Sequence, residues 1–227
     1  MTEENKKDGK ILSEDEAKTK LESLNETVDI DAAAEMVTDN NLEFDFENVH
    51  YRVRIPTFGE KKEVNNYRNR RQLFLLQETD EKGNLINKTE EALIEIYAKQ
   101  GVDIKAMDAR IKVLQEEIKQ ANIILGEALK EKDNVVALEN HRRDIVKLKE
   151  EIQVIIIQKT SLLEFSLENQ LTTDTYYYLT YLILEKKEED EWKRIWDKHE
   201  DFLNADTLLV NRATFYASCI SQQGLLF

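Results

Sequence analysis

The longest regular pattern of apolar residues lies in the middle of the chain, between residues 102 and 165. Apolar side chains recur there at alternating spacings of three and four, the a/d pattern of a coiled-coil heptad. The first stretch comprises Ile104, Met107, Ile111, Leu114, Ile118, Ala121, Leu125 and Ala128. The second comprises Leu138, His141, Ile145, Leu148, Ile152, Ile155, Lys159 and Leu162. The pattern predicts two helices, each roughly 40 Å long at the usual rise per residue.

A short polar segment, 131–134, separates these two stretches. Each helix has one apolar stripe, and the two stripes are best buried against each other. We therefore predict that segment 102–165 forms a long antiparallel helical hairpin with coiled-coil-like packing. A parallel homodimeric coiled coil is the alternative, which the polar break disfavours. Val154, Ile156 and Ile157 widen the second stripe. We therefore expect the base of the second helix to be covered by the rest of the domain.

The period changes to two in residues 42–55. Apolar residues alternate there with acidic residues before Asn48 and with basic residues after it, which predicts a β-hairpin with its turn near Glu47 and Asn48. The outer face of the first strand is acidic and that of the second is basic. We expect cross-strand pairs of Glu43 or Asp45 with Arg52 or Arg54 to stabilise the pairing.

Helical signals follow the hairpin. Pro56 ends the strand, and Thr57 with Glu60 matches a capping box, which predicts a helix over 58–78. Its apolar side is expected to consist of Val64, Tyr67, Leu73, Phe74 and Leu76. A second helix is predicted over 88–100, ended by Gly101.

The C-terminal part, 166–227, is also predicted to be mostly helical. Apolar spacing indicates a helix over 167–187, a short helix or turn over 197–204, and a last helix, N-capped by Asp206, up to about residue 221. Residues 183–187 and 192–196 can form a second small β-hairpin. The apolar end, 224–227, either packs on the core or contacts a partner.

Together these elements predict a mainly α protein with a small β-hairpin, of the α+β class. A long antiparallel helical hairpin, 102–165, is attached to a compact helical body made of 42–101 and 166–227. One proline and six glycines in 227 residues agree with long helices.

The first 41 residues differ in composition from the rest. They contain 12 acidic side chains and five lysines, with few large apolar residues. Segment 1–41 is therefore predicted to be a flexible acidic arm, apart from a short helix over 13–24 with a capping box of Ser13 and Glu16. The alternative is an arm that docks on a partner.

Charge and targeting signals exclude several classes of function. The formal net charge of −14 argues against nonspecific binding of nucleic acids and against binding to an anionic membrane. The single cysteine, Cys219, excludes a disulfide framework within one chain. No signal peptide or transmembrane run is visible. We expect a protein of the cytoplasm that does not bind membranes.

Residues with catalytic or metal-binding chemistry do not converge in the sequence. His50, His141 and His199 are scattered outside any two-histidine metal spacing, and no phosphate loop or nucleophile–base pair is evident. The sequence predicts no catalytic residues, no metal and no cofactor, and hence a protein that is not an enzyme.

Basic residues cluster between residues 49 and 71, where seven Lys or Arg accompany two Glu. This patch can bind an acidic protein, the chain's own acidic arm or, less favourably, nucleic acid, or it can be a solvated helix face. Tyr and Trp residues of 176–196 are either core or contact residues. The candidate partner-binding residues are Arg52, Arg54, Lys61, Lys62, Arg68, Arg70, Arg71, Trp192 and Trp196.

A short part of the chain resembles a known class of proteins. Phe44, Phe46, the segment 51–58 and Glu60 resemble the opening of bacteriophage tail-assembly chaperones, with a β-hairpin followed by a helix capped at a Pro-Thr pair. The resemblance covers about 42–80 and does not include the long hairpin, so a tail, baseplate or neck accessory subunit fits equally well. It implies that the partners are other phage structural subunits and that no cofactor is needed.

The sequence thus favours a non-enzymatic role in protein–protein interaction, as a structural or assembly protein of a bacteriophage. It would act in the host cytoplasm and in the virion, with self-association into a homo-oligomer as a further option. The alternative is an acidic regulatory adaptor or inhibitor that binds a host nucleic-acid enzyme by mimicking nucleic acid.

Overall fold

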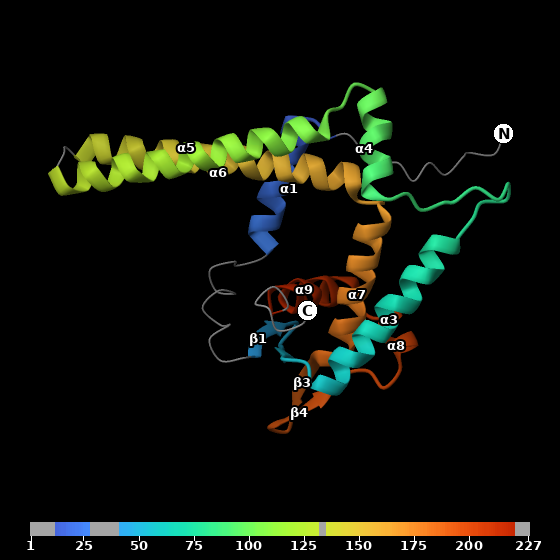
Figure 1. The fold of residues 1–227 in the computed structure, drawn as a ribbon. Coiled ribbons are helices and arrows are strands. Elements are labelled where there is room, and N and C mark those ends of the chain that lie inside the picture. The colour runs from blue at the N-terminus through green and yellow to red at the C-terminus, as the bar shows by residue number, and fades with distance from the viewer. Residues whose placement is uncertain (1–11, 28–40, 132–134, 221–227) are drawn as a thin grey trace. The chain divides into compact units, whose positions relative to one another are not determined.

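The protein is mostly helical and contains one small antiparallel sheet (Figure 1). The computed structural model describes residues 12–27, 41–131 and 135–220. The helices are α1 (Glu14–Thr27), α3 (Phe58–Gln77), α4 (Glu90–Lys99), α5 (Ile104–Glu131), α6 (Val135–Leu163), α7 (Leu167–Ile183), α8 (His199–Leu203) and α9 (Thr207–Ile220). The strands are β1 (Asn41–Phe46), β2 (Val49–Arg54), β3 (Leu184–Glu188) and β4 (Glu191–Arg194). This composition agrees with the predicted mainly α member of the α+β class.

The chain folds into two compact units. Unit 1 consists of Met1–Leu24 and Lys88–Ser166, and unit 2 consists of Asn25–Asn87 and Leu167–Phe227. The division falls near residue 87 rather than near residue 101, because Leu93 and Tyr97 of α4 are buried with Ile104 and Leu162. Helix α4 therefore belongs with α5 and α6, whereas the sequence grouped it with the β-hairpin.

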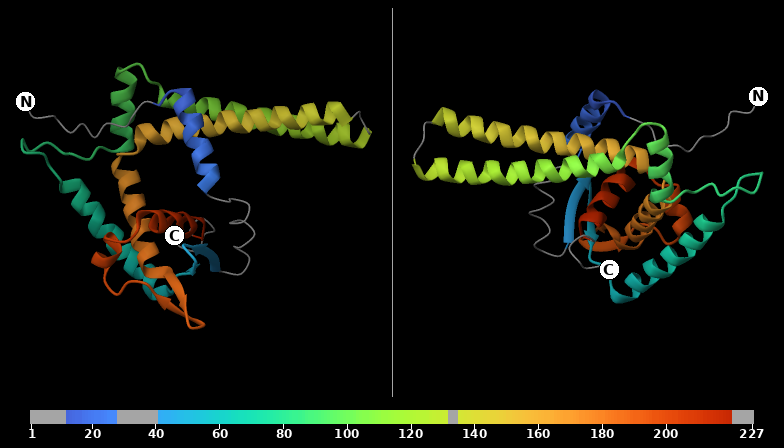
Figure 2. Two further views of the ribbon diagram at one scale, coloured as in Figure 1. Left: turned by 180° about the vertical axis from the view of Figure 1, so that it is seen from behind. Right: turned by 45° about the horizontal axis from the view of Figure 1, so that its top comes forward.

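Helices α5 and α6 of unit 1 lie side by side in every view (Figures 1 and 2). Arg110, near the start of α5, bonds Glu151 of α6 at 2.8 Å. Lys159, near the end of α6, bonds Asp108 of α5 at 2.6 Å. The start of one helix therefore meets the end of the other. All sixteen positions of the predicted heptads are buried or half-buried. The coiled-coil geometry itself stays a prediction.

Helix α1 occupies part of the outer side of α6. The predicted capping box is present, since the backbone N–H of Glu16 donates to the Ser13 hydroxyl at 3.2 Å. Gln158 of α6 donates to the carbonyl of Leu12 at 3.2 Å, and Ala17 has no exposed surface. This part of the acidic arm therefore packs on α6. The rest of the arm lies outside the described residues.

The sheet of unit 2 has the order β1-β2-β3-β4, with each strand antiparallel to its neighbour. It consists of the two predicted hairpins. Both turn pairs, Glu47-Asn48 and Glu189-Asp190, have positive φ angles, as expected for two-residue turns that match the strand twist. The pairing of β2 with β3, which joins the hairpins into one sheet, is not visible in the sequence pattern.

One face of the sheet forms the core of unit 2. Leu42, Phe44, Tyr51 and Val53 point to this face and are buried together with residues of α7 and α9. The ring centroid of Phe44 lies 5.1 Å from that of Tyr216 on α9. Asp206 caps α9 as predicted, accepting hydrogen bonds from the backbone N–H groups of residues 208 and 209. The last apolar residues, 224–227, lie outside the described residues.

Helix α3 begins as predicted, and its buried side was predicted correctly at Val64 but incorrectly at three later positions. The capping box of Thr57 and Glu60 is present. Val64 and Leu75 are each 1% exposed, because residues eleven apart lie in line after three turns and face α7. Three residues expected on the apolar side, Leu73, Phe74 and Leu76, are instead exposed.

No described helix is both long enough and apolar enough to span a membrane.

Candidate interaction surface

Two of the predicted contact residues, Arg52 and Arg54, are used within the fold. Arg54 bonds Glu60 through both terminal nitrogens, at 2.7 and 2.8 Å, and bonds Glu185 through Nε at 2.9 Å. Arg52 bonds the other oxygen of Glu185 at 2.6 Å. The carboxylates that bond these arginines are therefore Glu60 and Glu185, whereas the sequence suggested Glu43 or Asp45.

The cluster formed by Arg52, Arg54, Glu60 and Glu185, here called the arginine cluster, joins β2, β3 and the start of α3. The side chains of Arg54, Glu60 and Glu185 are only 18%, 15% and 11% exposed. Burial by itself raises the pKa of Glu60, but hydrogen bonds from Arg54 and Thr57 outweigh it and lower that pKa to about 2. Hydrogen bonding to Glu60 raises the pKa of Arg54. Both groups are charged at neutral pH, so the cluster is a structural element and not a free basic patch.

The remaining basic residues of the predicted patch lie on α3. Arg71 is half-buried, bonds Asp174 of α7 at 2.6 Å, and holds its guanidinium 5.0 Å from the ring centre of Phe74. Lys61 is half-buried, whereas Lys62, Arg68 and Arg70 are exposed. The basic patch of the sequence is thus divided between a buried cluster and exposed positions of α3.

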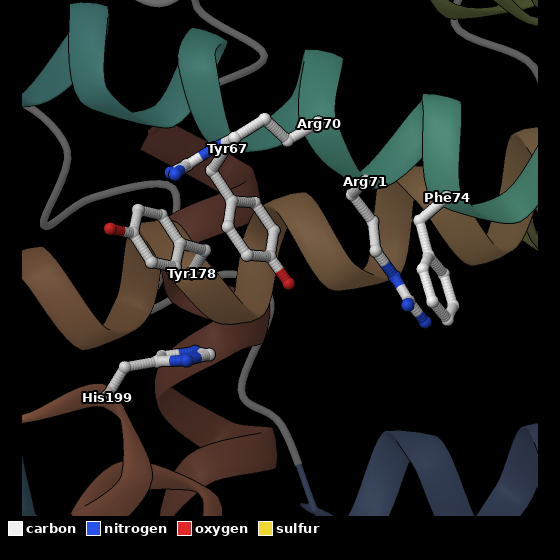
Figure 3. A pocket seen from close by; sticks show the side chains of 6 residues that line it. All are labelled: Tyr67, Arg70, Arg71, Phe74, Tyr178 and His199. Atoms are coloured by element: carbon white, nitrogen blue, oxygen red, sulfur yellow. The ribbon is translucent and has the colours of Figure 1, made fainter.

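A shallow pocket of about 390 Å³ lies beside α3 (Figure 3). It is lined by Tyr67, Arg70, Arg71, Phe74, Tyr178 and His199. The rings of Tyr67 and Tyr178 are stacked with centroids 4.1 Å apart. Figure 3 shows Arg71 and Phe74 side by side, with the ring of His199 below the tyrosine pair. Aromatic rings and arginine at one concave site are the residue types that dominate protein-binding surfaces.

The polar groups of this pocket are held by the fold. The Tyr178 hydroxyl donates to Glu63 at 2.7 Å, and burial with this carboxylate raises the pKa of Tyr178 to about 12. Burial lowers the pKa of His199, whose ring lies against Tyr178 and Tyr181. His199 is therefore neutral at physiological pH and acts here as a packing ring.

Sequence reasoning missed this pocket. Tyr67 and Tyr178 are far apart in the sequence, and each fits an ordinary apolar helix position. No spacing signal connects them with His199, which stood out only as one of three scattered histidines. The pocket exists because α3 packs along α7, and that contact is tertiary.

The two tryptophans lie elsewhere. Trp192 of β4 is on the polar face of the sheet, where the guanidinium of Arg52 is 4.5 Å from its ring centre and His50 is 5.4 Å away. Trp196 packs edge-on against Phe202 at 5.0 Å and is half-buried. The structure therefore does not bring Trp192 or Trp196 together with the outward side of α3.

His50 gives the sheet a pH-dependent contact. Its Nδ1 lies 2.7 Å from Asp45 and its Nε2 3.0 Å from Glu43. Hydrogen bonds to Asp45 and Glu43 raise the pKa of His50 above the ordinary 6.5. A raised folded-state pKa means that this stabilisation is complete below the unfolded-state pKa and is lost as the pH rises through the folded-state value.

We expect His50→Gln to be less stable than the wild type at acidic pH, with a difference that shrinks as the pH rises above about 6.5. Urea denaturation of both proteins across this range measures the difference. Because both partners of His50 are well exposed, the effect should be small and should weaken in high salt. A difference that stays constant with pH would contradict this role.

Comparisons of the chain with models of protein families, with curated proteins and with solved structures find no match. Among the described residues, no group of three or more His, Cys, Asp or Glu is placed to hold a metal ion. The candidate site of this protein is therefore defined by its surface geometry alone.

Proposed function

We propose that this chain is a non-enzymatic protein–protein interaction subunit, and that it serves as a structural or assembly protein of a bacteriophage. In this proposal it works in the host cytoplasm and in the particle, as a tail, baseplate or neck accessory subunit or as an assembly chaperone. The observation that carries the interaction role is the exposed apolar surface of α5 and α6.

Helices α5 and α6 are long, and many of their large apolar side chains are not buried. The two helices have 28 and 29 residues, and their predicted heptad positions are buried or half-buried. Large apolar side chains remain outside that stripe, each at least 46% exposed. They are Val113, Ile123, Ile124, Leu129, Val136, Val146 and Ile156. Such residues on a rigid two-helix element suit helix-on-helix contact with another chain.

The phage assignment is supported by the order of elements in 42–80. Strands β1 and β2 form a hairpin, Pro56 follows, and Thr57 caps α3. This is the order for which that segment resembles tail-assembly chaperones. Two long paired helices also suit an accessory subunit that bridges other subunits.

The proposal is tested by co-expression with the products of the neighbouring genes. We expect the chain to copurify with a phage structural protein and to lose that complex when Ile123→Glu and Ile124→Glu are combined. Two buried interface charges should weaken binding by at least about a hundredfold, a change readily seen in a pull-down.

The matched control is the double variant Gln115→Glu and Asn140→Glu. It adds the same two charges at exposed positions of α5 and α6 without removing apolar surface, and it should keep the complex. Equal loss of the complex in both double variants would show that the added charge alone is responsible. Copurification with a host nucleic-acid enzyme in place of a phage protein would instead favour the regulatory adaptor.

A further inference from the structure

The outward side of α3 ends in a group of exposed apolar side chains. Leu73, Phe74 and Leu76 are 59%, 54% and 44% exposed. They face outward because Val64 and Leu75 are the residues that α3 buries against α7. Leu73 and Leu76, three residues apart, lie on one side of the helix, and Phe74 lies round from them towards the pocket, so large apolar side chains are exposed around the end of α3.

This apolar group continues directly into the pocket described above, because Phe74 belongs to both. Beyond Phe74 the pocket is formed by the rings of Tyr67, Tyr178 and His199 (Figure 3). Tyr67 and Tyr178 are stacked, His199 meets Tyr178 edge-on, and the Tyr178 hydroxyl is bonded to Glu63. The pocket is therefore a preformed, shallow recess with aromatic walls and arginines at its side, against which a large side chain of a partner can pack.

The charge around the recess is mixed, because the carboxylate of Glu63 lies beside it and is bonded to Tyr178. Arg71 is neutralised by Asp174, whereas the exposed Arg70 forms no ion pair with a carboxylate of the described residues. Lys62, two turns before Arg70, is also exposed. Lys62, Arg70 and Arg71 outnumber Glu63 and Asp174 by one charge, so this part of α3 is weakly positive in a chain with a formal net charge of −14. An acidic partner would therefore meet opposite charge here, while the rest of the chain repels it.

We propose that the α3 surface, defined by Lys62, Tyr67, Arg70, Leu73, Phe74 and Tyr178, binds an acidic protein segment that presents a large apolar side chain. The apolar side chain lies against Phe74 in the recess. Neighbouring carboxylates accept hydrogen bonds from Arg70, whose planar guanidinium donates to both oxygens of one carboxylate. This inference rests on the proposed interaction role and names the chemistry of one partner.

Binding is measured with the full chain and a dye-labelled short peptide of Asp and Glu with one central Trp, by fluorescence anisotropy. Two peptides are compared with it, one with Ala in place of Trp and one with Lys in place of every acidic residue. We expect the first peptide to bind most tightly and the Lys peptide not to bind. Affinity should fall as the salt concentration rises.

Two variants test the surface, each with a matched control. Arg70→Glu and Phe74→Ala should each weaken binding of the Trp peptide about tenfold or more. Arg142→Glu places the same charge reversal at an exposed site of α6, and Leu208→Ala removes an apolar side chain that is 69% exposed on α9. Both controls should bind as the wild type does, and circular dichroism should show all four variants folded.

Several results would overturn the inference. Equal binding of the Trp and Ala peptides would show that the recess holds no side chain. Equal losses in the variants and their controls would show that the α3 surface is not the site. Tighter binding of single-stranded RNA than of the Trp peptide, with the same loss in Arg70→Glu, would assign the surface to nucleic acid. None of these results bears on the α5–α6 contact, which the Ile123 and Ile124 variants test separately.

Discussion

Replacing Arg54 by Ala is expected to lower the free energy of unfolding of unit 2 by about 3 to 5 kcal/mol. Arg54 donates to Glu60 and Glu185 and also to the backbone carbonyls of Ile55 and Leu182. Its removal leaves Glu60, which has little exposure, without its main partner, and leaves Glu185 with its bond to Arg52. The cost arises from this uncompensated burial of charge, which is larger than the net gain from forming the pair.

Urea denaturation followed by circular dichroism measures the Arg54→Ala effect. Arg143→Ala, at an exposed position of α6, should change stability by at most about 0.5 kcal/mol. Combining Arg54→Ala with Glu60→Gln should cost less than the sum of the single changes, because the buried charge is removed together with its partner. A loss below about 1 kcal/mol in Arg54→Ala would contradict the structural role of the arginine cluster.

The arginine cluster also determines how the stability of unit 2 changes at acidic pH. The pKa of Glu60 is lowered to about 2, so its contribution to stability is complete above the unfolded-state pKa. That contribution is lost as the pH falls from about 4.5 towards 2. In Arg54→Ala the partner that lowers this pKa is absent, and this acid-dependent loss should largely disappear.

Replacing Leu114 by Ala is the second change expected to have a large effect, about 3 kcal/mol on the stability of unit 1. Leu114 has no exposed surface and occupies a predicted heptad position of α5. Truncation removes buried methyl groups and leaves a cavity between two long helices that cannot easily close around it.

The neighbouring residue provides the control for Leu114→Ala. Val113 is 50% exposed, so Val113→Ala should change stability by at most about 0.5 kcal/mol, with a slight gain from the better helix propensity of Ala. Thermal denaturation followed by circular dichroism compares the two variants. Similar losses for both would mean that Val113 is covered as deeply as Leu114, and that the predicted stripe is misplaced.

Helices and hairpins were predictable wherever a local signal sufficed. The heptad positions from Ile104 to Leu162 anticipated which residues of α5 and α6 lose their exposure, since that follows from the period of a single helix. The capping boxes at Ser13 and Thr57 anticipated two helix starts for the same reason. The alternation in 42–55 anticipated β1 and β2.

The side of α3 that is buried could not be read from its sequence, because apolar residues occur on several sides of this helix. Leu73, Phe74 and Leu76 outnumber Leu75 in the same turns, yet Leu75 is the residue in line with Val64. Which side is buried depends on where α7 lies. The candidate site also depends on the position of α7, since Phe74 is exposed because α3 buries Leu75 against α7.

The partners of the arginines also depended on the tertiary structure. Glu43 faces Arg52 across the β1–β2 pair, and local pairing suggested a bond between them. The bond instead goes to Glu185, because β3 pairs with the other edge of β2 and offers a carboxylate that is more deeply buried. A buried acceptor is a stronger partner than a solvated one.

The sequence by itself determined the heptad pattern of α5 and α6, the two β-hairpins and the helix caps, because each depends on residues that are close to one another in the chain. Its composition determined the acidic balance. Only the tertiary structure decided the four-stranded sheet, the arginine cluster and the recess beside Phe74. These depend on pairs such as Arg52 with Glu185 and Tyr67 with Tyr178. More than a hundred residues separate each pair, and no local period can encode such a contact.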